Sequence, residues 1–164
     1  DRLYEGKITK LREKTQGQLV IKEYPTASAH SGHFKSLMNE LALKKSFRPD
    51  VIFIDYLNIC ASSRFKGGNI SSYFYVKAIA EELRGLAVEF NVPIFSATQT
   101  TRTGYVSTDI GLEDTSESFG LPATADFMFA LISNEELEAL GQMKVKQLKN
   151  RYNDPSINLS LIHI

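Results

Sequence analysis

The chain has 164 residues, which suffices for one domain with a sizeable core. It carries 19 Lys and Arg against 19 Asp and Glu, and this balance excludes a globally basic protein. Its single cysteine, Cys60, excludes an internal disulfide and fits a reducing compartment. Neither a signal peptide nor an apolar run long enough to cross a bilayer is present, so we expect a soluble, cytoplasmic protein with no membrane partner.

The first third of the chain alternates helical and extended patterns. The opening residues predict the end of a helix that stops near Gly17, and residues 18–24 predict a strand. A helix follows over about residues 32–46, where Ser31 or Thr26 can supply the N-cap. We therefore expect a helix, a strand and a helix before the first buried strand.

That buried strand ends in an aspartate. Residues 51–54 form a continuous apolar run, typical of a central parallel strand covered on both faces, and Asp55 follows directly. An acidic side chain at the carboxyl end of a strand lies where open α/β sheets bind their ligands, and nucleotide-hydrolysing motors hold Mg²⁺ there. A plain strand followed by a turn-initiating aspartate has the same pattern, so both interpretations stay open.

The remaining elements continue the alternation. In order, the sequence predicts a loop at 60–70, an amphipathic helix at about 72–90, a strand at 93–98, a polar loop at 100–113, a short helix around 113–119, a strand at 126–132, a helical turn at 133–141 and a strand at 143–148. The positions of the long helix that should face inward are Val76, Ile79, Leu83, Leu86 and Phe90. Strands alternating with helices imply an α/β fold with a mainly parallel sheet flanked by helices, in one domain.

Gln99 follows the strand that comes after the Asp55 strand. Because neighbouring parallel strands end at the same edge of a sheet, Asp55 and Gln99 should lie at one edge. A neutral amide there can hydrogen-bond a γ-phosphate or a water molecule and so report whether the phosphate is present. An isolated glutamine is otherwise an ordinary surface residue.

Five cations could contact phosphate groups. Lys149 and Arg151 alternate at the end of a late strand, so both should point to one side, where an arginine can act on a phosphate as an arginine finger. Arg64, Lys66 and Arg102 lie in loops after the strands of Asp55 and Gln99, and such loops can hold a phosphate backbone without reading its sequence. A solvated basic turn and ordinary surface loops are the alternatives.

The order of these elements resembles a known family. The words that carry the resemblance are IDYL at 54–57, NVPIFSATQ at 91–99, SESFGLPATADFMFAL at 116–131 and KQLKNRYND at 146–154. They are similar to the RecA-like motor domain of replicative hexameric helicases of the DnaB type. The phage members of T-even type are the most similar, through KAIAEELR at 77–84 and LPATADFM at 121–128. The resemblance covers residues 1–158.

The resemblance implies ATP and Mg²⁺ as cofactors. By it, Asp55 is the Walker B carboxylate on Mg²⁺ and Gln99 is the γ-phosphate sensor. Arg151 corresponds to the arginine finger and Lys149 to the accompanying basic residue, both acting on the neighbouring subunit's ATP.

The resemblance also implies a nucleic-acid partner and an assembly. The loops at 60–70 and 100–112, with Arg64, Lys66 and Arg102, correspond to those that line a central channel for single-stranded DNA. The expected partners are further copies of the chain in a homohexameric ring, a primase and a helicase loader. A phage-encoded helicase would act in the cytoplasm of the bacterial host.

The chain departs from the family in ways that suggest a fragment. It contains no G-x-x-x-x-G-K-[ST] and lacks the catalytic glutamate that follows that motif, so we expect an incomplete RecA-like sheet with an exposed apolar slot and no ATPase activity in the chain alone. A non-catalytic RecA-like binding or regulatory module, or a RecA-family recombinase, remain alternative functions.

The last six residues have a separate interpretation. Residues 159–164 match the translation of an adapter used to prepare sequencing libraries, so we expect a non-native tail after a motor-domain segment at 1–158. The apolar content also allows a final β-strand, which is the alternative.

Overall fold

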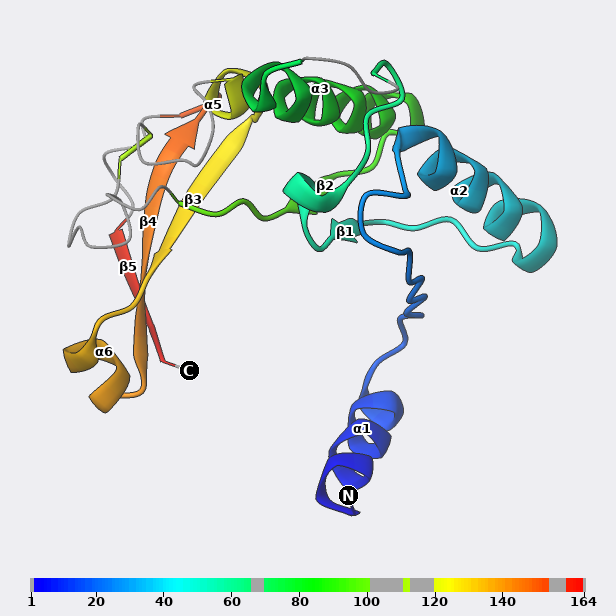
Figure 1. The fold of residues 1–164 in the computed structure, drawn as a ribbon. Coiled ribbons are helices and arrows are strands. Elements are labelled where there is room, and N and C mark those ends of the chain that lie inside the picture. The colour runs from blue at the N-terminus through cyan, green and yellow to red at the C-terminus, as the bar shows by residue number, and fades with distance from the viewer. Residues whose placement is uncertain (1, 66–69, 101–110, 113–119, 154–158, 164) are drawn as a thin grey trace.

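The computed structural model describes residues 2–65, 70–100, 111–112, 120–153 and 159–163 (Figure 1). Its elements are α1 (Arg2–Lys14), α2 (Ser31–Lys45), β1 (Ile52–Ile54), the 3-10 helix η1 (Leu57–Ile59), α3 (Ser72–Phe90), β2 (Ile94–Ser96), α5 (Gly120–Thr124), β3 (Phe127–Ile132), α6 (Glu135–Ala139), β4 (Gln142–Asn150) and β5 (Leu159–His163). Figure 1 shows α1 standing apart from the other elements. None of the described helices is long and apolar enough to span a membrane.

Helix α3 organises the main core. Its inward positions recur at helical spacing as predicted, and Val76, Ile79, Leu83 and Leu86 are all buried, with Ile79 only 1% exposed. This core is completed by three buried residues from other elements, Leu57, Cys60 and Leu121. The partly buried side chains that pack against the core are those of Phe34, Ile54 and Tyr75. The core therefore joins α3 to the segment after β1 and to α5.

Strands β1 and β2 pair in parallel, as predicted from their order in the chain. Ile52 lies opposite Ile94 and Ile54 opposite Ser96, whose hydroxyl donates to the Ile54 carbonyl at 2.8 Å. The expectation that both faces of this sheet are covered is wrong for this chain, because Phe53 is 72% exposed. Phe53 stacks on Phe95 at a ring-centroid distance of 5.4 Å, so an uncovered aromatic surface remains on one face of an incomplete fold.

The other described strands pair antiparallel. β3 pairs with β4 from Phe127 opposite Asn150 to Ile132 opposite Lys144, and β4 also pairs antiparallel with β5. The sequence order suggested mainly parallel pairing, but the connection at 133–141 is shorter than the dozen or more residues that a parallel crossover needs. Residues 159–163 form β5, the conformation considered above as the alternative to a non-native tail.

The strand predicted at 18–24 does not form in the described part of the chain. Those residues belong to no helix or sheet, and Leu19 and Ile21 are each 83% exposed. A strand exists only where a second strand supplies hydrogen bonds, and no described segment pairs with this one.

The N-cap of α2 also differs from the prediction. His30 is the cap, with its Nδ1 accepting from the Gly32 amide at 3.0 Å, and the His30 amide donates to His33 Nδ1 at 3.3 Å. Neither Ser31 nor Thr26 caps the helix, because the Ser31 hydroxyl donates to Glu82 at 2.8 Å instead.

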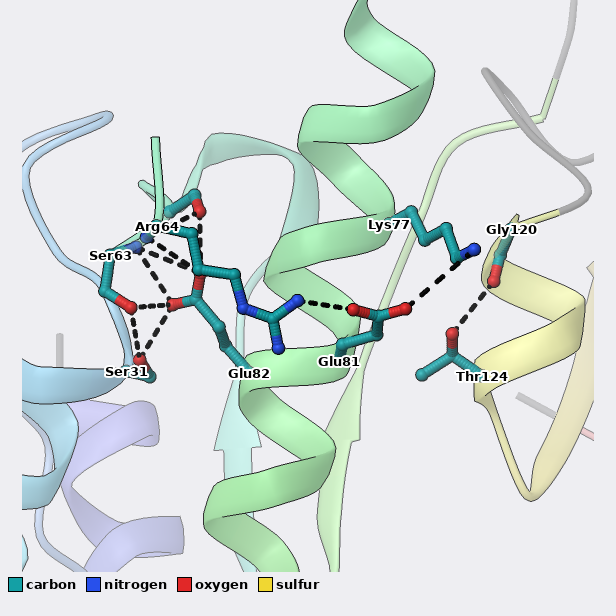
Figure 2. Close-up of polar contacts among 9 residues, drawn as sticks. Ser31, Ser63, Arg64, Lys77, Glu81, Glu82, Gly120 and Thr124 are labelled. Carbon is teal, nitrogen blue, oxygen red and sulfur yellow. Dashed lines mark hydrogen bonds and ion pairs between the residues drawn. The ribbon is translucent and has the colours of Figure 1, made fainter. Parts of the chain in front are cut away.

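The Glu82 carboxylate holds three segments together (Figure 2). It accepts from the hydroxyls of Ser31 at 2.8 Å, Ser62 at 2.6 Å and Ser63 at 2.7 Å, and from the Ser63 amide at 2.9 Å. These donors come from the start of α2 and from the loop after η1. Partial burial acts to raise the pKa of Glu82, but the hydrogen bonds from Ser62, Ser63 and Ser31 outweigh burial and lower this pKa to about 2.

We expect this carboxylate to make folding sensitive to acid. Because the folded-state pKa of Glu82 lies below its unfolded value, the stabilisation is present above about pH 4.5 and is lost as the pH falls toward 2. Allowing for solvent screening, the loss should be about 1–2 kcal/mol in the free energy of unfolding. Urea unfolding between pH 2 and 6 measures it.

Two variants make that measurement specific. Glu82→Gln should be less stable at neutral pH and should flatten the acid dependence, whereas Ser62→Ala, which removes one donor, should flatten it only in part. An unchanged pH slope in Glu82→Gln would show that this carboxylate does not link the three segments.

Candidate functional site

The parallel sheet brings the segments of Asp55 and Gln99 to one edge. Past the last paired residues, the Leu57 amide donates to the Ala97 carbonyl at 3.2 Å, so the two chains still run side by side. The Gln99 side-chain amide then donates to the Tyr56 hydroxyl at 3.3 Å. The juxtaposition expected from parallel order is therefore present.

Asp55 offers an exposed carboxylate at this edge. Mg²⁺ in nucleotide sites keeps several waters and is held by one or two carboxylates together with phosphate oxygens, so a single exposed aspartate fits that ion. The described residues contain no group of three His, Cys, Asp or Glu side chains placed to hold a metal by themselves. The fit is thus to a metal that arrives with phosphates. The Asp55–Tyr56 peptide bond is cis.

Three polar residues beside this edge were not identified from the sequence. Tyr56 accepts from Gln99, and its position directly after Asp55 was the available signal. Asn58 Oδ1 and Thr98 Oγ1 are buried and have no hydrogen-bond partner among the described residues. Such atoms are rare in folded proteins, and these two belong to the segments that follow β1 and β2.

Lys149 and Arg151 form a second cluster at the end of β4. The Lys149 ammonium donates to the Pro122 carbonyl, and an Arg151 terminal nitrogen donates to the Ala123 carbonyl at 3.1 Å. Both side chains thus reach the carboxyl end of α5, as expected for alternate residues of a strand. The carbonyl ends of helices favour cations.

Charge surrounds this cluster. Burial and the neighbouring Arg151 charge lower the pKa of Lys149, with Asp126 opposing them. Asp126, which the sequence analysis did not single out, pairs with both Arg151 and Arg84. Arg84, Ala123 and Arg151 line an open pocket of about 510 Å³.

The structure does not bring all four predicted catalytic residues together. Asp55 and Gln99 lie at the end of β1 and β2, whereas Lys149 and Arg151 lie at the end of β4 in the other sheet. Among the described residues, no hydrogen bond or ion pair joins the two pairs. The four residues therefore lie in two separate pairs.

Of the three loop cations expected to contact nucleic acid, only Arg64 can be placed. Its guanidinium pairs with Glu81 on α3, which Lys77 approaches from the other side at 3.9 Å (Figure 2). Part of the Arg64 charge is therefore compensated in this structure. Lys66 and Arg102 lie outside the described residues.

The chain is similar to known proteins in both sequence and fold. The chain is 51% identical over 152 residues to a DnaB-like replicative helicase of Enterobacteria phage T4, a match that covers 92% of this chain and 32% of that protein. The chain thus spans about a third of its relative's length. No family model matches the chain.

Two solved structures share the fold. One, described as an ATPase domain, superposes with a TM-score of 0.66 at 20% identity, covering 82% of this chain and 47% of that one. A DnaB-like replicative helicase, described together with its interactions with primase, gives a TM-score of 0.67 at 19% identity, covering 85% and 34%. The fold is that of a RecA-like helicase ATPase domain, and this chain holds an incomplete version of it.

Proposed function

We propose, from the relationship of this chain to DnaB-like replicative helicases, that residues 1–158 are the carboxyl part of a RecA-like motor domain. In the complete protein, this motor couples ATP hydrolysis to movement along single-stranded DNA and to duplex unwinding. The observation that carries the proposal is that Asp55 and Gln99 follow the ends of the paired strands β1 and β2, at one edge of the sheet. The chain that shows this arrangement is 51% identical to such a helicase. Residues 159–164 take no part in this proposal.

Asp55 and Gln99 act on the nucleotide bound by their own subunit. Asp55 holds Mg²⁺, which screens the charge of the phosphates during transfer. Gln99 already uses its amide in a long, exposed hydrogen bond to Tyr56, so it can exchange that partner for a γ-phosphate or an attacking water. This exchange makes Gln99 the sensor of hydrolysis.

Lys149 and Arg151 act on the nucleotide of a neighbouring subunit. Their separation from Asp55 and Gln99 within one chain supports this division. In the proposed ring, the end of one subunit's β4 lies against the next subunit's site. Both cations are held by backbone carbonyls of α5, so they are positioned before a phosphate arrives.

The partners follow from the same proposal. Single-stranded DNA contacts the loops at 60–70 and 100–112 through Arg64, Lys66 and Arg102, in the channel of a homohexamer. Primase and a helicase loader are the proposed protein partners, and one structural neighbour is described with its primase interactions. The relationship to a helicase favours this function over a recombinase or a binding module without catalysis.

Replacing Asp55 tests the metal assignment. In the complete helicase that carries this sequence, Asp55→Asn should lower ATP turnover at least about 10²-fold while nucleotide binding changes far less, because a charge contact in the transition state is lost. Asp50→Asn removes the same charge beside the opposite end of β1 and should leave turnover unchanged. Wild-type ATP turnover in Asp55→Asn would contradict the assignment of Asp55 as the metal-binding carboxylate.

The chain alone should show no ATPase activity, because its sequence lacks the phosphate-binding loop. It should bind single-stranded DNA weakly, and its binding constant should fall as the salt concentration rises. In a plot of the logarithm of the binding constant against the logarithm of the salt concentration, the slope should become shallower by about 0.7 for each phosphate contact removed. Fluorescence anisotropy with Lys66→Ala and Arg102→Ala measures that change, and Lys10→Ala on α1 serves as the control. Robust ATP hydrolysis by residues 1–164 would contradict the proposal that the nucleotide site needs a phosphate-binding loop that this sequence lacks.

Arg151 should act in trans. Arg151→Ala should lower turnover by roughly 10³-fold or more in the complete ring, with a much smaller change in nucleotide affinity. Subunits with Arg151→Ala and an intact phosphate-binding loop are mixed with subunits that keep Arg151 but lack that loop's lysine. Mixed rings should regain ATPase activity at interfaces that pair the two intact halves.

The mixing experiment needs proof of subunit exchange, which native mass spectrometry of the mixed rings supplies. If exchange occurs and no mixture exceeds the sum of the two inactive parents, Arg151 does not serve a neighbour's site.

A further inference from the structure

Asp126 lies between two arginines that come from different elements. Its Oδ1 is 2.9 Å from Arg151 Nε and 3.2 Å from a terminal nitrogen of Arg84 on α3. The Asp126 carbonyl also accepts the Arg151 backbone amide at 2.9 Å. One residue therefore binds both the main chain and the side chain of Arg151.

These contacts fix the direction of the Arg151 side chain. Nε is bound by Asp126, and one terminal nitrogen is bound by the Ala123 carbonyl at 3.1 Å. A guanidinium has five N–H groups in a planar fork, so these two contacts leave further donors that an anion from outside the chain can use. Arg151 remains partly exposed, which permits such an approach.

The elements that carry these contacts are themselves anchored. Phe127, next to Asp126, pairs with Asn150, next to Arg151, in the β3–β4 ladder. Helix α5 lies close against α3, since a Cβ on Gly120 would be 3.1 Å from the Lys77 Cβ. The carboxylate and the carbonyl that bind Arg151 thus have little freedom to move.

We propose that Asp126 is a positioning residue that holds the Arg151 guanidinium in the direction it needs to reach a phosphate on a neighbouring subunit. This inference rests on the proposed function, in which Arg151 acts in trans. Asp126 contacts no nucleotide itself. It supplies a carboxylate between Arg151 and the like charges of Arg84 and Lys149, which would otherwise repel Arg151 from this direction.

Steady-state kinetics in the complete ring tests the proposal. Asp126→Asn should lower kcat roughly 10- to 100-fold, as expected when a reacting group loses its alignment, while KM for ATP stays within about twofold. Asp126→Glu should recover part of the loss, because it restores the charge. Glu89→Gln is the matched control: it neutralises a carboxylate of α3 whose ion pair is with Lys35 rather than with Asp126 or Arg151, so kcat should stay near the wild-type value.

A double-mutant cycle separates positioning from a general structural role. In the Arg151→Ala background, Asp126→Asn should lower kcat no further, since there is no guanidinium left to position. In mixed rings, the Asp126→Asn defect should follow the subunit that supplies Arg151. Without nucleotide, the effects of Asp126→Asn and Arg151→Ala on the unfolding temperature should be non-additive.

Each contrary outcome has a distinct meaning. Equal losses of kcat in both backgrounds, or a defect that follows the ATP-binding subunit, overturn the positioning role. Wild-type turnover in Asp126→Asn while Arg151→Ala is inactive overturns it and leaves the proposed function standing. Wild-type turnover in Arg151→Ala overturns the trans role of Arg151 and the positioning role together.

Discussion

The carboxylate of Glu82 connects segments that are far apart in the sequence, and the path of the chain after β1 depends on it. Ser62 and Ser63 donate to it from the loop that also carries Arg64, and Ser31 donates from the start of α2. Hydrogen bonds to a charged acceptor are stronger than those between neutral groups. The first residues of the loop proposed to contact DNA are therefore held against α3.

Helix α3 also contacts the cluster around Arg151. Its buried face packs around Ile79, Glu82 binds the serines, and Arg84 pairs with Asp126. Because successive residues of a helix point about 100° apart, one short stretch of α3 can serve the core, the loop and the Arg151 cluster at once. A shift of α3 would therefore move the residues around Arg151 together with the segment after β1 that packs against this helix.

Features that depend on residues close together in the sequence could be predicted, whereas features that depend on contacts between distant segments could not. The bounds of α3 were predictable, because its apolar period is local and strong. The strand expected at 18–24 does not form, since strand pairing depends on a distant partner that the local pattern does not reveal. The N-cap at His30 was missed because the Ser31 hydroxyl, the expected cap, binds Glu82 instead. The edge of Asp55 and Gln99 followed from parallel order, whereas Asp126 has no local signature and is recognised only by its contacts with Arg84 and Arg151.

The order of the segments suggests how hydrolysis and DNA movement would be coupled in the proposed motor. The segment with Arg64 begins shortly after Asp55, and the segment at 100–112, expected from the sequence to be a polar loop, begins directly after Gln99. Gln99 is tied to the first strand through Tyr56, so a change of its hydrogen-bond partner when the γ-phosphate leaves alters the contact between the two segments that lead into these loops. In the proposed motor, signalling would need no long pathway through the core. It would need one amide that binds either Tyr56 or the phosphate, close to the start of the two segments proposed to contact DNA.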